Sequence, residues 1–313
     1  MSKIINYRFL IITLTIIIGL FVYLVKTNTG TKILNTATPN SRLQIVTSFY
    51  PLYFFTTQIA KEKADVYNIT PAGAEPHDYE PTTKDMVKIE NSQILIINGG
   101  KFETWTDNIQ NILGKQNIKI IDIGENLANQ NIIEKNIKIR DPHFWLDPII
   151  AKKEVELITK NLTTIDPINI NFYTNNYKIL IEKLETLNNK LQTELNNCQK
   201  KDIVTSHAAF KYLAERYGLK QTAISGLSPD EEPTPKQLAE VSDFALKNKI
   251  QYIFFESLVS PKLANTIAQE IGAKTLTLNP IEGLTDEEIK NGKNYFTEME
   301  KNLINLKIAL QCQ

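Results

Sequence analysis

A long, uninterrupted helical stretch in the middle of the chain constrains the fold more than any other feature. It follows Asp166-Pro167 and runs to about Asn196, and apolar side chains recur in it every three or four residues, at Leu180, Ile181, Leu184, Leu187, Leu191 and Leu195. That spacing predicts one apolar helix face. At about 1.5 Å per residue, a helix of about thirty residues is about 45 Å long, which exceeds one small domain. We therefore expect it to pass along both halves of the protein.

Strand and helix patterns alternate on both sides of this stretch. Before it, strands are expected at 43–49, 64–70, 93–98 and 118–122, and helices at 52–62, 84–91 and 149–164. After it, strands at 202–205, 221–224, 252–255 and 274–278 alternate with helices at 208–217, 235–248, 261–272 and the C-terminus. The run 93–98 is apolar almost throughout, as expected for a strand covered on both faces. This alternation predicts doubly wound α/β sheets.

The predicted fold consists of two doubly wound α/β lobes joined by a long rigid connecting helix. A chain of 313 residues is long enough for two compact domains. We assign 43–165 to the N-terminal lobe, 166–198 to the connecting helix and 199–313 to the C-terminal lobe. Such lobes would enclose a cleft between facing strand ends, and the carboxyl ends of parallel strands are the usual ligand sites of open α/β sheets.

The N-terminus carries an apolar run over residues 9–25, preceded by Lys3 and Arg8. As a helix it approaches the thickness of a bilayer core, and it has no polar stripe. It is either a signal peptide or a signal-anchor. The run exceeds a typical signal-peptide core and no A-x-A cleavage pattern follows, which favours an uncleaved anchor over 1–25. Residues 26–42 are then a tether, and the body is extracytoplasmic, in the periplasm or on the outer face of the cytoplasmic membrane.

Charge and cysteine content bear on the partners of the protein and on its possible disulfide. The 35 basic and 35 acidic residues cancel, which gives no indication of a nucleic-acid partner. Only Cys198 and Cys312 are present. An extracytoplasmic location would permit a disulfide between them, and two unpaired buried thiols are the alternative.

The chain contains only three histidines, and each occupies a distinctive local pattern. His77 lies in Gly-Ala-Glu-Pro-His-Asp-Tyr-Glu-Pro, His143 in Asp-Pro-His-Phe-Trp-Leu-Asp-Pro, and His207 in Val-Thr-Ser-His-Ala-Ala-Phe. Neutral imidazole is a common ligand of borderline-soft cations, and three such ligands leave one position open in a tetrahedral zinc site. A single loop histidine is more often a surface residue, and no H-E-x-x-H or C-x-x-C motif is present. Three distant segments must therefore converge through the fold to make one metal site.

Taken together, these segments resemble the metal-binding substrate-binding proteins of zinc and manganese ABC importers. The matching stretches are 47–51, 71–82, 141–148, 206–218, 224–235, 255–261 and 276–284. The resemblance implies two α/β lobes joined by a rigid helix, with an ion in the cleft. It also implies that His77, His143 and His207 are metal ligands. Zinc-type members have His at the third position, where typical manganese-type members have Glu.

The chain departs from the family pattern at one ligand position. The family commonly has Asp before the Pro-x-Glu-Gly segment, and this chain has Asn279. Asn279, Glu75, Glu256 or water are therefore candidates to complete the metal shell, and Glu256 could instead orient a ligand histidine. A nitrogen-rich site suits Zn²⁺ better than Mn²⁺. The histidine-rich loop of some zinc-type members is missing, because 123–140 contains no histidine.

The resulting functional hypothesis is an extracytoplasmic, membrane-tethered receptor that captures Zn²⁺ and delivers it to an ABC permease. We expect a monomer without enzymatic activity and without a nucleic-acid partner. Two other hypotheses are a zinc-dependent hydrolase, because three histidines with an open position also describe a catalytic site, and an adhesin-like surface protein. Asp78, Asp141 and Asp147 are interpreted as turn caps.

Overall fold

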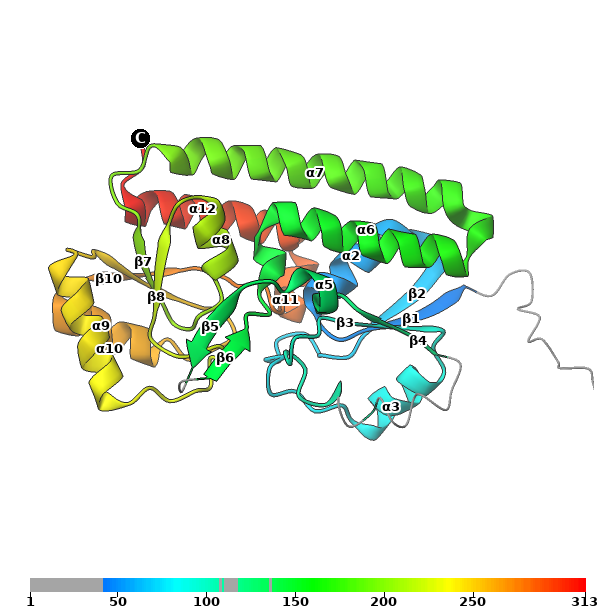
Figure 1. Ribbon diagram of the computed structural model, residues 1–313, viewed down its shortest axis with the longest axis horizontal. Helices are drawn as coiled ribbons and strands as arrows, with labels where there is room; N and C mark the ends of the chain where they lie inside the picture. Colours follow the sequence, from blue (N-terminus) through cyan, green and yellow to red (C-terminus); the bar gives the residue numbers. More distant parts are fainter. Residues whose placement is uncertain (1–41, 107–108, 110–117, 135–136) are drawn as a thin grey trace, which may run out of the picture. The chain divides into compact units, whose positions relative to one another are not determined.

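Two four-stranded parallel sheets form the framework of the computed structural model, which describes residues 42–106, 109, 118–134 and 137–313. The first sheet has the order β2-β1-β3-β4 and the second the order β10-β9-β7-β8 (Figure 1). The strands are β1 Leu43–Thr47, β2 Ala64–Asn68, β3 Ile94–Ile97, β4 Lys119–Asp122, β7 Asp202–Thr205, β8 Lys220–Ala223, β9 Tyr252–Phe255 and β10 Lys274–Thr277. Every pairing within these sheets is parallel, which confirms the predicted α/β class.

Helices cover the sheets and follow the predicted alternation. Their bounds are α2 Tyr50–Ala60, α3 Thr83–Glu90, α5 Gly124–Leu127, α6 Pro148–Ile165, α7 Ile170–Asn196, α8 Lys211–Arg216, α9 Pro235–Lys247, α10 Lys262–Ile271, α11 Asp286–Lys290 and α12 Tyr295–Leu310. Helix α2 packs on β1 and β2, whereas α10 packs on β9 and β10. Several helices begin at a side-chain cap, as at Thr82 and Thr234, where a hydroxyl accepts from the backbone of the first turn.

Several local features differ from the prediction, and the short helices α5 and α11 are among them, because the sequence assigned no element to either. The helix expected from residue 208 begins at Lys211, because residues 206–210 form the loop that carries His207. Strands β5 Asn131–Glu134 and β6 Ile137–Arg140 pair as an antiparallel hairpin in a segment to which the sequence assigned no element. The run Ile137-Lys-Ile-Arg140 does alternate apolar and polar residues, so a strand signal was present in the sequence.

Helix α7 is the predicted long central helix. It has 27 residues, about 40 Å at 1.5 Å per residue, and packs against α2, α6 and α12 (Figure 1). The predicted apolar stripe is buried at Leu180, Leu184, Leu187, Leu191 and Leu195, and Ile181 packs beside it. One hydrophobic cluster contains this stripe together with residues of both sheets, including Ile45 and Ile203. Both sheets therefore share a continuous core through the central helix.

A disulfide joins Cys198, just after α7, to Cys312, just after α12. Of the two alternatives that the sequence left open, the disulfide is the one found. Because α7 and α12 pack side by side, the bridge fastens their neighbouring ends. It closes a loop with a sequence separation of 114 residues.

The expected N-terminal anchor at 1–25 and the tether at 26–42 fall outside the described residues, except for Arg42. Among the helices that the structure describes, none is long and apolar enough to cross a membrane.

Candidate metal centre

Three histidines and one glutamate converge in a buried cluster. The Nε2 atom of His143 lies 3.2 Å from Nε2 of His77 and 3.4 Å from Nε2 of His207. Glu282 Oε1 lies 3.3 Å from His143 Nε2 and 3.4 Å from the other two Nε2 atoms. His143 and His207 are fully buried, Glu282 is 1% exposed and His77 is 7% exposed. Three Nε2 atoms and one carboxylate oxygen therefore point at the same small volume.

Each of these residues lies in a loop that follows a strand. His77 is in the loop between β2 and α3, His143 lies after β6, His207 after β7, and Glu282 after β10. In the second sheet, β7 and β9 are neighbours, although β8 lies between them in sequence. The strand order reverses direction there, which is where open α/β sheets place ligands. The end of β7 supplies His207 and the end of β9 supplies Glu256, so the sheet brings the two together.

Two carboxylates fix the orientation of two of the rings. Asp141 Oδ1 lies 2.8 Å from His143 Nδ1, and Glu256 Oε2 lies 2.7 Å from His207 Nδ1. The same carboxylates accept the backbone N–H groups of His143 and His207, at 3.0 and 3.1 Å. An ionised carboxylate can only accept, so each Nδ1 donates and Nε2 is the ring atom directed at the cluster, where its lone pair is available once the ring is neutral.

Burial and neighbouring charges shift the pKa values of the three histidines in different directions. Burial lowers the pKa of His77 to about 4, against the opposing effect of Glu282. Burial also acts to lower the pKa of His143 and His207. For His143, Asp141 and Glu282 outweigh burial and raise the pKa above its ordinary value. For His207, Glu256 and Glu282 raise the pKa well above its ordinary value. Without a cation, the cluster therefore holds a proton on His207.

The two nearby glutamates have opposite protonation behaviour. Burial acts to raise the pKa of Glu282, but His207, His143 and His77 outweigh it and hold that pKa well below its usual range. Burial and the neighbouring charge of Glu282 raise the pKa of Glu75 to about 9. Glu282 is thus an anion at neutral pH, whereas Glu75 carries a proton. Glu75 Oε1 accepts the backbone N–H of His77 at 3.1 Å.

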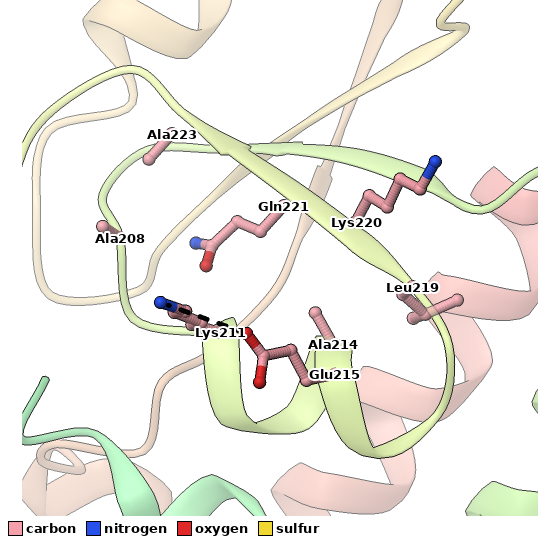
Figure 2. A pocket seen from close by; sticks show the side chains of 8 residues that line it. All are labelled: Ala208, Lys211, Ala214, Glu215, Leu219, Lys220, Gln221 and Ala223. Carbon is pink, nitrogen blue, oxygen red and sulfur yellow. Dashed lines mark ion pairs between the residues drawn. The ribbon is translucent and has the colours of Figure 1, made fainter. Parts of the chain in front are cut away.

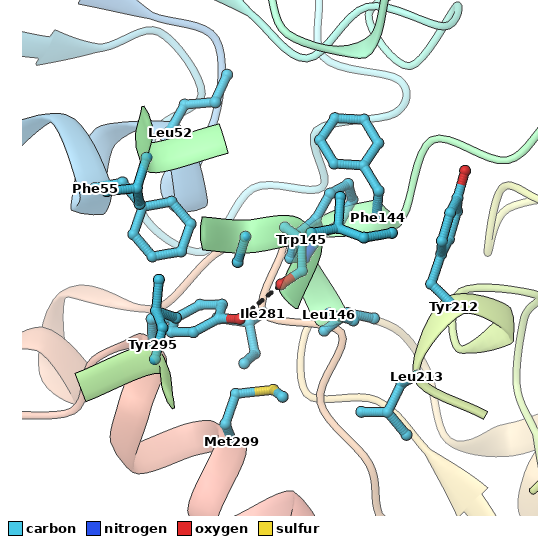
Figure 3. Packing of buried hydrophobic residues seen from close by; sticks show 14 of the residues in the cluster. Leu52, Phe55, Phe144, Trp145, Leu146, Tyr212, Leu213, Ile281, Tyr295 and Met299 are labelled. Carbon is cyan, nitrogen blue, oxygen red and sulfur yellow. Dashed lines mark hydrogen bonds between the residues drawn. The ribbon is translucent and has the colours of Figure 1, made fainter. Parts of the chain in front are cut away.

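The turn that carries His143 is held from both sheets. On one side, the Nδ2 group of Asn98 donates to Pro142 O at 3.0 Å, and Glu103 accepts the backbone N–H of Asn98 at 2.6 Å. On the other side, Trp145 Nε1 donates to Pro280 O at 2.8 Å. Tyr295 Oη donates to Trp145 O at 2.6 Å (Figure 3). Trp145 therefore connects the His143 turn to the turn that carries Glu282.

A separate pocket of about 340 Å³ is lined by Ala208, next to His207 in sequence, and by residues of α8, of β8 and of the turn between them (Figure 2). None of the four clustered side chains lines it. One lining residue, Gln221, donates from Nε2 to His207 O at 3.0 Å and to Thr205 Oγ1 at 2.7 Å. The wall of this pocket therefore supports the backbone of the His207 loop.

The structure brings together some of the residues expected from sequence and not others. His77, His143 and His207 meet in one cluster, and Glu256 contacts His207, as expected for a residue that orients a ligand. Glu75 lies beside the cluster and bonds to the backbone of His77. Asn279 is not in the cluster. Its Oδ1 accepts the backbone N–H of Ile281 at 2.8 Å, and its Nδ2 donates to Glu298 at 3.1 Å, so both ends of the amide are engaged elsewhere.

Two residues of the site were missed from sequence. The fourth corner of the cluster is Glu282, three residues after Asn279. Asp141, interpreted as a turn cap, also contacts the ring of His143. The only local signal for Glu282 is its place in Pro-Ile-Glu-Gly, a segment of the family pattern that does not by itself indicate a ligand. Asp147, by contrast, caps α6 as expected, because its side chain accepts from Ile149 N.

The chemistry of the cluster favours a borderline-soft divalent cation. Three imidazole nitrogens and one carboxylate oxygen, with their donor atoms within 4.8 Å of one another, match the ligand types and number of a four-coordinate zinc site. An oxygen-preferring ion such as Mn²⁺ would find only one oxygen among the four atoms. Fold and site together define a class: an α/β protein with two parallel sheets and a buried cluster whose side chains could hold a metal ion.

The comparisons with known proteins identify the family within this class. The family model for the periplasmic zinc-uptake complex component A, ZnuA, matches residues 45–309, and the chain belongs to that family. The chain is 39% identical over 280 residues to the high-affinity zinc uptake system protein ZnuA of Bacillus subtilis, covering 86% of this chain and 88% of that protein. It is 42% identical to the zinc-binding lipoprotein AdcA of Streptococcus pneumoniae, but spans only 56% of AdcA.

Solved structures of zinc-binding and metal-transporting proteins are also similar to this chain. The Zn(II)-bound ZnuA-like domain of Streptococcus pneumoniae AdcA is 42% identical, with a TM-score of 0.75, covering 86% of this chain and 99% of that domain. The laminin-binding protein Lmb of Streptococcus agalactiae, described as a bifunctional protein with adhesin and metal-transporting activity, is 33% identical with a TM-score of 0.79. That match covers 86% of this chain and all of Lmb.

Proposed function

We propose that this protein is an extracytoplasmic receptor that captures Zn²⁺ and delivers it to an ABC permease in the membrane. The observation that carries the proposal is the convergence of three Nε2 atoms and one carboxylate oxygen in a buried site. The family assignment supports the same function, because the similar proteins are named for zinc uptake or zinc binding. Zn²⁺ is the cargo of such a receptor.

In this proposal His77, His143, His207 and Glu282 are the zinc ligands. Asp141 and Glu256 set the ring orientation of His143 and His207 and increase the basicity of their Nε2 atoms. Glu282 supplies one negative charge and the three neutral imidazoles supply none. The four ligands therefore balance one of the two positive charges of Zn²⁺. Zinc is preferred over manganese because imidazoles supply three of four ligand atoms.

The proposed architecture of the receptor follows the predicted boundaries. Residues 43–165 and 199–313 are the two lobes, and 166–198 is the connecting helix. The hydrophobic cluster that both sheets share along α7 supports a rigid connection between the two lobes. Residues 1–25 would anchor the chain in the membrane and 26–42 would tether the receptor, which we propose acts as a monomer.

We propose that the protein is not an enzyme. A catalytic zinc site keeps one coordination position open for water or substrate, whereas here a fourth protein group occupies that corner. Adhesion is a second candidate function. It is supported by the likeness to Lmb, whose description combines adhesion with metal transport.

The proposal is tested by a competitive Zn²⁺ titration of the purified full chain against a chelator of known affinity. We expect one high-affinity site per chain, with His143→Ala and Glu282→Gln each weakening it. Mn²⁺ titrated in parallel should bind more weakly. Stoichiometric zinc binding that survives both substitutions would contradict the assignment of the site.

A further inference from the structure

We propose that Asn279 is a positioning residue that aims Glu282 at the three histidines, and that it must be an amide because it faces Glu298. This inference rests on the proposed function, since it concerns how the fourth zinc ligand is held. It also gives a role to the one ligand position at which the chain departs from the family pattern.

The residue before Glu282 has an unusual backbone conformation. Ile281 has φ 60°, in the left-handed region that β-branched residues rarely adopt. Its side chain is fully buried in the main core (Figure 3). The turn therefore persists only because its surroundings hold it. The nearest constraint is Asn279, whose Oδ1 accepts the Ile281 backbone N–H at 2.8 Å.

Two buried side chains of helix α12, one helical turn apart, form hydrogen bonds with Asn279. Asn302 Oδ1 accepts the backbone N–H of Asn279 at 2.8 Å, and Asn302 Nδ2 donates to its backbone O at 2.6 Å. Glu298 Oε2 accepts from Asn279 Nδ2 at 3.1 Å. Every polar atom of Asn279 is thus engaged, and the turn to Glu282 starts from a fixed point.

The contact with Glu298 explains why an amide suits this position. Asn279 and Glu298 are both 2% exposed, so little solvent separates them. An Asp at position 279 could still accept the Ile281 N–H with one oxygen. Its other oxygen would replace the Nδ2 donor and face the Glu298 carboxylate at about hydrogen-bond distance. Like charges so close in a buried site repel strongly, and the turn would shift to separate them.

A double-mutant cycle tests whether Asn279 acts through Glu282. Zn²⁺ affinity of the full chain is measured by chelator competition for the parent, Asn279→Ala, Glu282→Gln and the double variant. Asn279→Ala should weaken binding about 10–100-fold, the usual effect of removing a group that orients a metal ligand. In the Glu282→Gln background the same change should have much less effect, because the interaction it supports is already weakened. Equal losses in both backgrounds would overturn the positioning role.

A charge exchange tests the need for an amide. Asn279→Asp should weaken Zn²⁺ binding, and Asn279→Asp with Glu298→Gln should restore it, because the amide and carboxylate have exchanged places. Glu298→Gln alone is the matched control and should bind nearly as the parent, since its amide oxygen can still accept from Asn279. Parent-like binding by Asn279→Asp alone, or a failure of the double variant to recover affinity, would overturn the inference.

Two controls keep these outcomes separate. Thermal unfolding of each metal-free variant identifies any that fail to fold, and the restored double variant then decides the result. His143→Ala is titrated alongside. If His143→Ala binds zinc as tightly as the parent, the proposed function has failed. If it loses binding while every Asn279 variant behaves as the parent, only the positioning inference has failed.

Discussion

At the scale of single residues, the titration of His207 links zinc binding to pH. Glu256 and Glu282 hold its pKa well above the ordinary value, so His207 carries a proton in the metal-free protein at neutral pH. Zinc requires the neutral imidazole, and binding must release that proton. His77, with a pKa lowered to about 4, is already neutral and contributes none. Affinity should therefore rise with pH from 5 through neutrality, until the raised pKa of His207 is passed.

Calorimetry in two buffers of different ionisation enthalpy measures this release directly. We expect at least one proton per zinc at pH 7, because His207 must lose its proton to bind and the raised pKa of His143 adds to the release. No proton release, with affinity constant from pH 5 to 7.5, would mean that these nitrogens do not hold the ion.

Glu256 provides a second test at this scale. Its carboxylate accepts both the ring Nδ1–H and the backbone N–H of His207. Glu256→Gln keeps the size of the side chain but removes the charge, and zinc affinity should fall about 10–100-fold. Asp78→Asn is a suitable control, because Asp78 is adjacent to His77 in sequence but exposed. Zinc titration of both variants should show a loss only for Glu256→Gln.

At the scale of elements, α6 contains a buried acid whose charge opposes folding. Glu154 is fully buried, and neither carboxyl oxygen has a hydrogen-bond partner among the described residues. Burial raises its pKa to about 8, against the usual 4.5. An acid with a raised folded-state pKa binds its proton more tightly in the folded protein. Stability is therefore lost as pH rises from about 4.5 to about 8.

Glu154→Met should remove that loss while keeping the side-chain volume. The gain in free energy of unfolding should be several kcal/mol larger at pH 8 than at pH 5, since each pKa unit corresponds to about 1.4 kcal/mol. Urea unfolding of the metal-free parent and variant at both pH values measures it. An identical gain at the two pH values would show that Glu154 ionises normally.

The disulfide between the ends of α7 and α12 gives another prediction for these elements. For a loop of 114 residues, the chain-entropy model gives a stabilisation of about 4–5 kcal/mol. Cys198→Ser combined with Cys312→Ser should lower the free energy of unfolding by up to that amount. Zinc affinity should stay near that of the parent, because neither cysteine contacts the cluster. Denaturant unfolding and zinc titration of the same sample separate the two effects.

Most elements could be predicted because their signals are local. The leucine stripe of α7 and the buried run of β3 each specify an element within one segment. The site was harder to predict. Histidines are rare in this chain and could be grouped, but Glu282 is one acid among many, and it reaches the cluster through a turn in which Ile281 has φ 60°. Asn279 was a candidate ligand because it stands where the family commonly has Asp. Its hydrogen bonds to Glu298 and Asn302 on α12 exclude that role, and no pattern near residue 279 indicates them.

At the scale of the whole molecule, zinc should stabilise the fold. The cluster draws on loops from both sheets, so unfolding either sheet removes ligands. Zinc present at 100 times its dissociation constant should raise the free energy of unfolding by about 2.7 kcal/mol. Thermal unfolding with and without zinc measures the shift, and His77→Ala and His143→Ala should each reduce it. The same shift in both variants would place the ion elsewhere.

The central claim is that one zinc ion sits among His77, His143, His207 and Glu282. The most direct measurement is a crystal structure of the zinc-loaded protein with data collected on both sides of the zinc absorption edge. We predict one strong anomalous peak at about 2.0–2.1 Å from the three Nε2 atoms and about 2.0–2.2 Å from a Glu282 oxygen. A fully occupied zinc peak bonded to other residues, with these four side chains left unligated, would contradict the account.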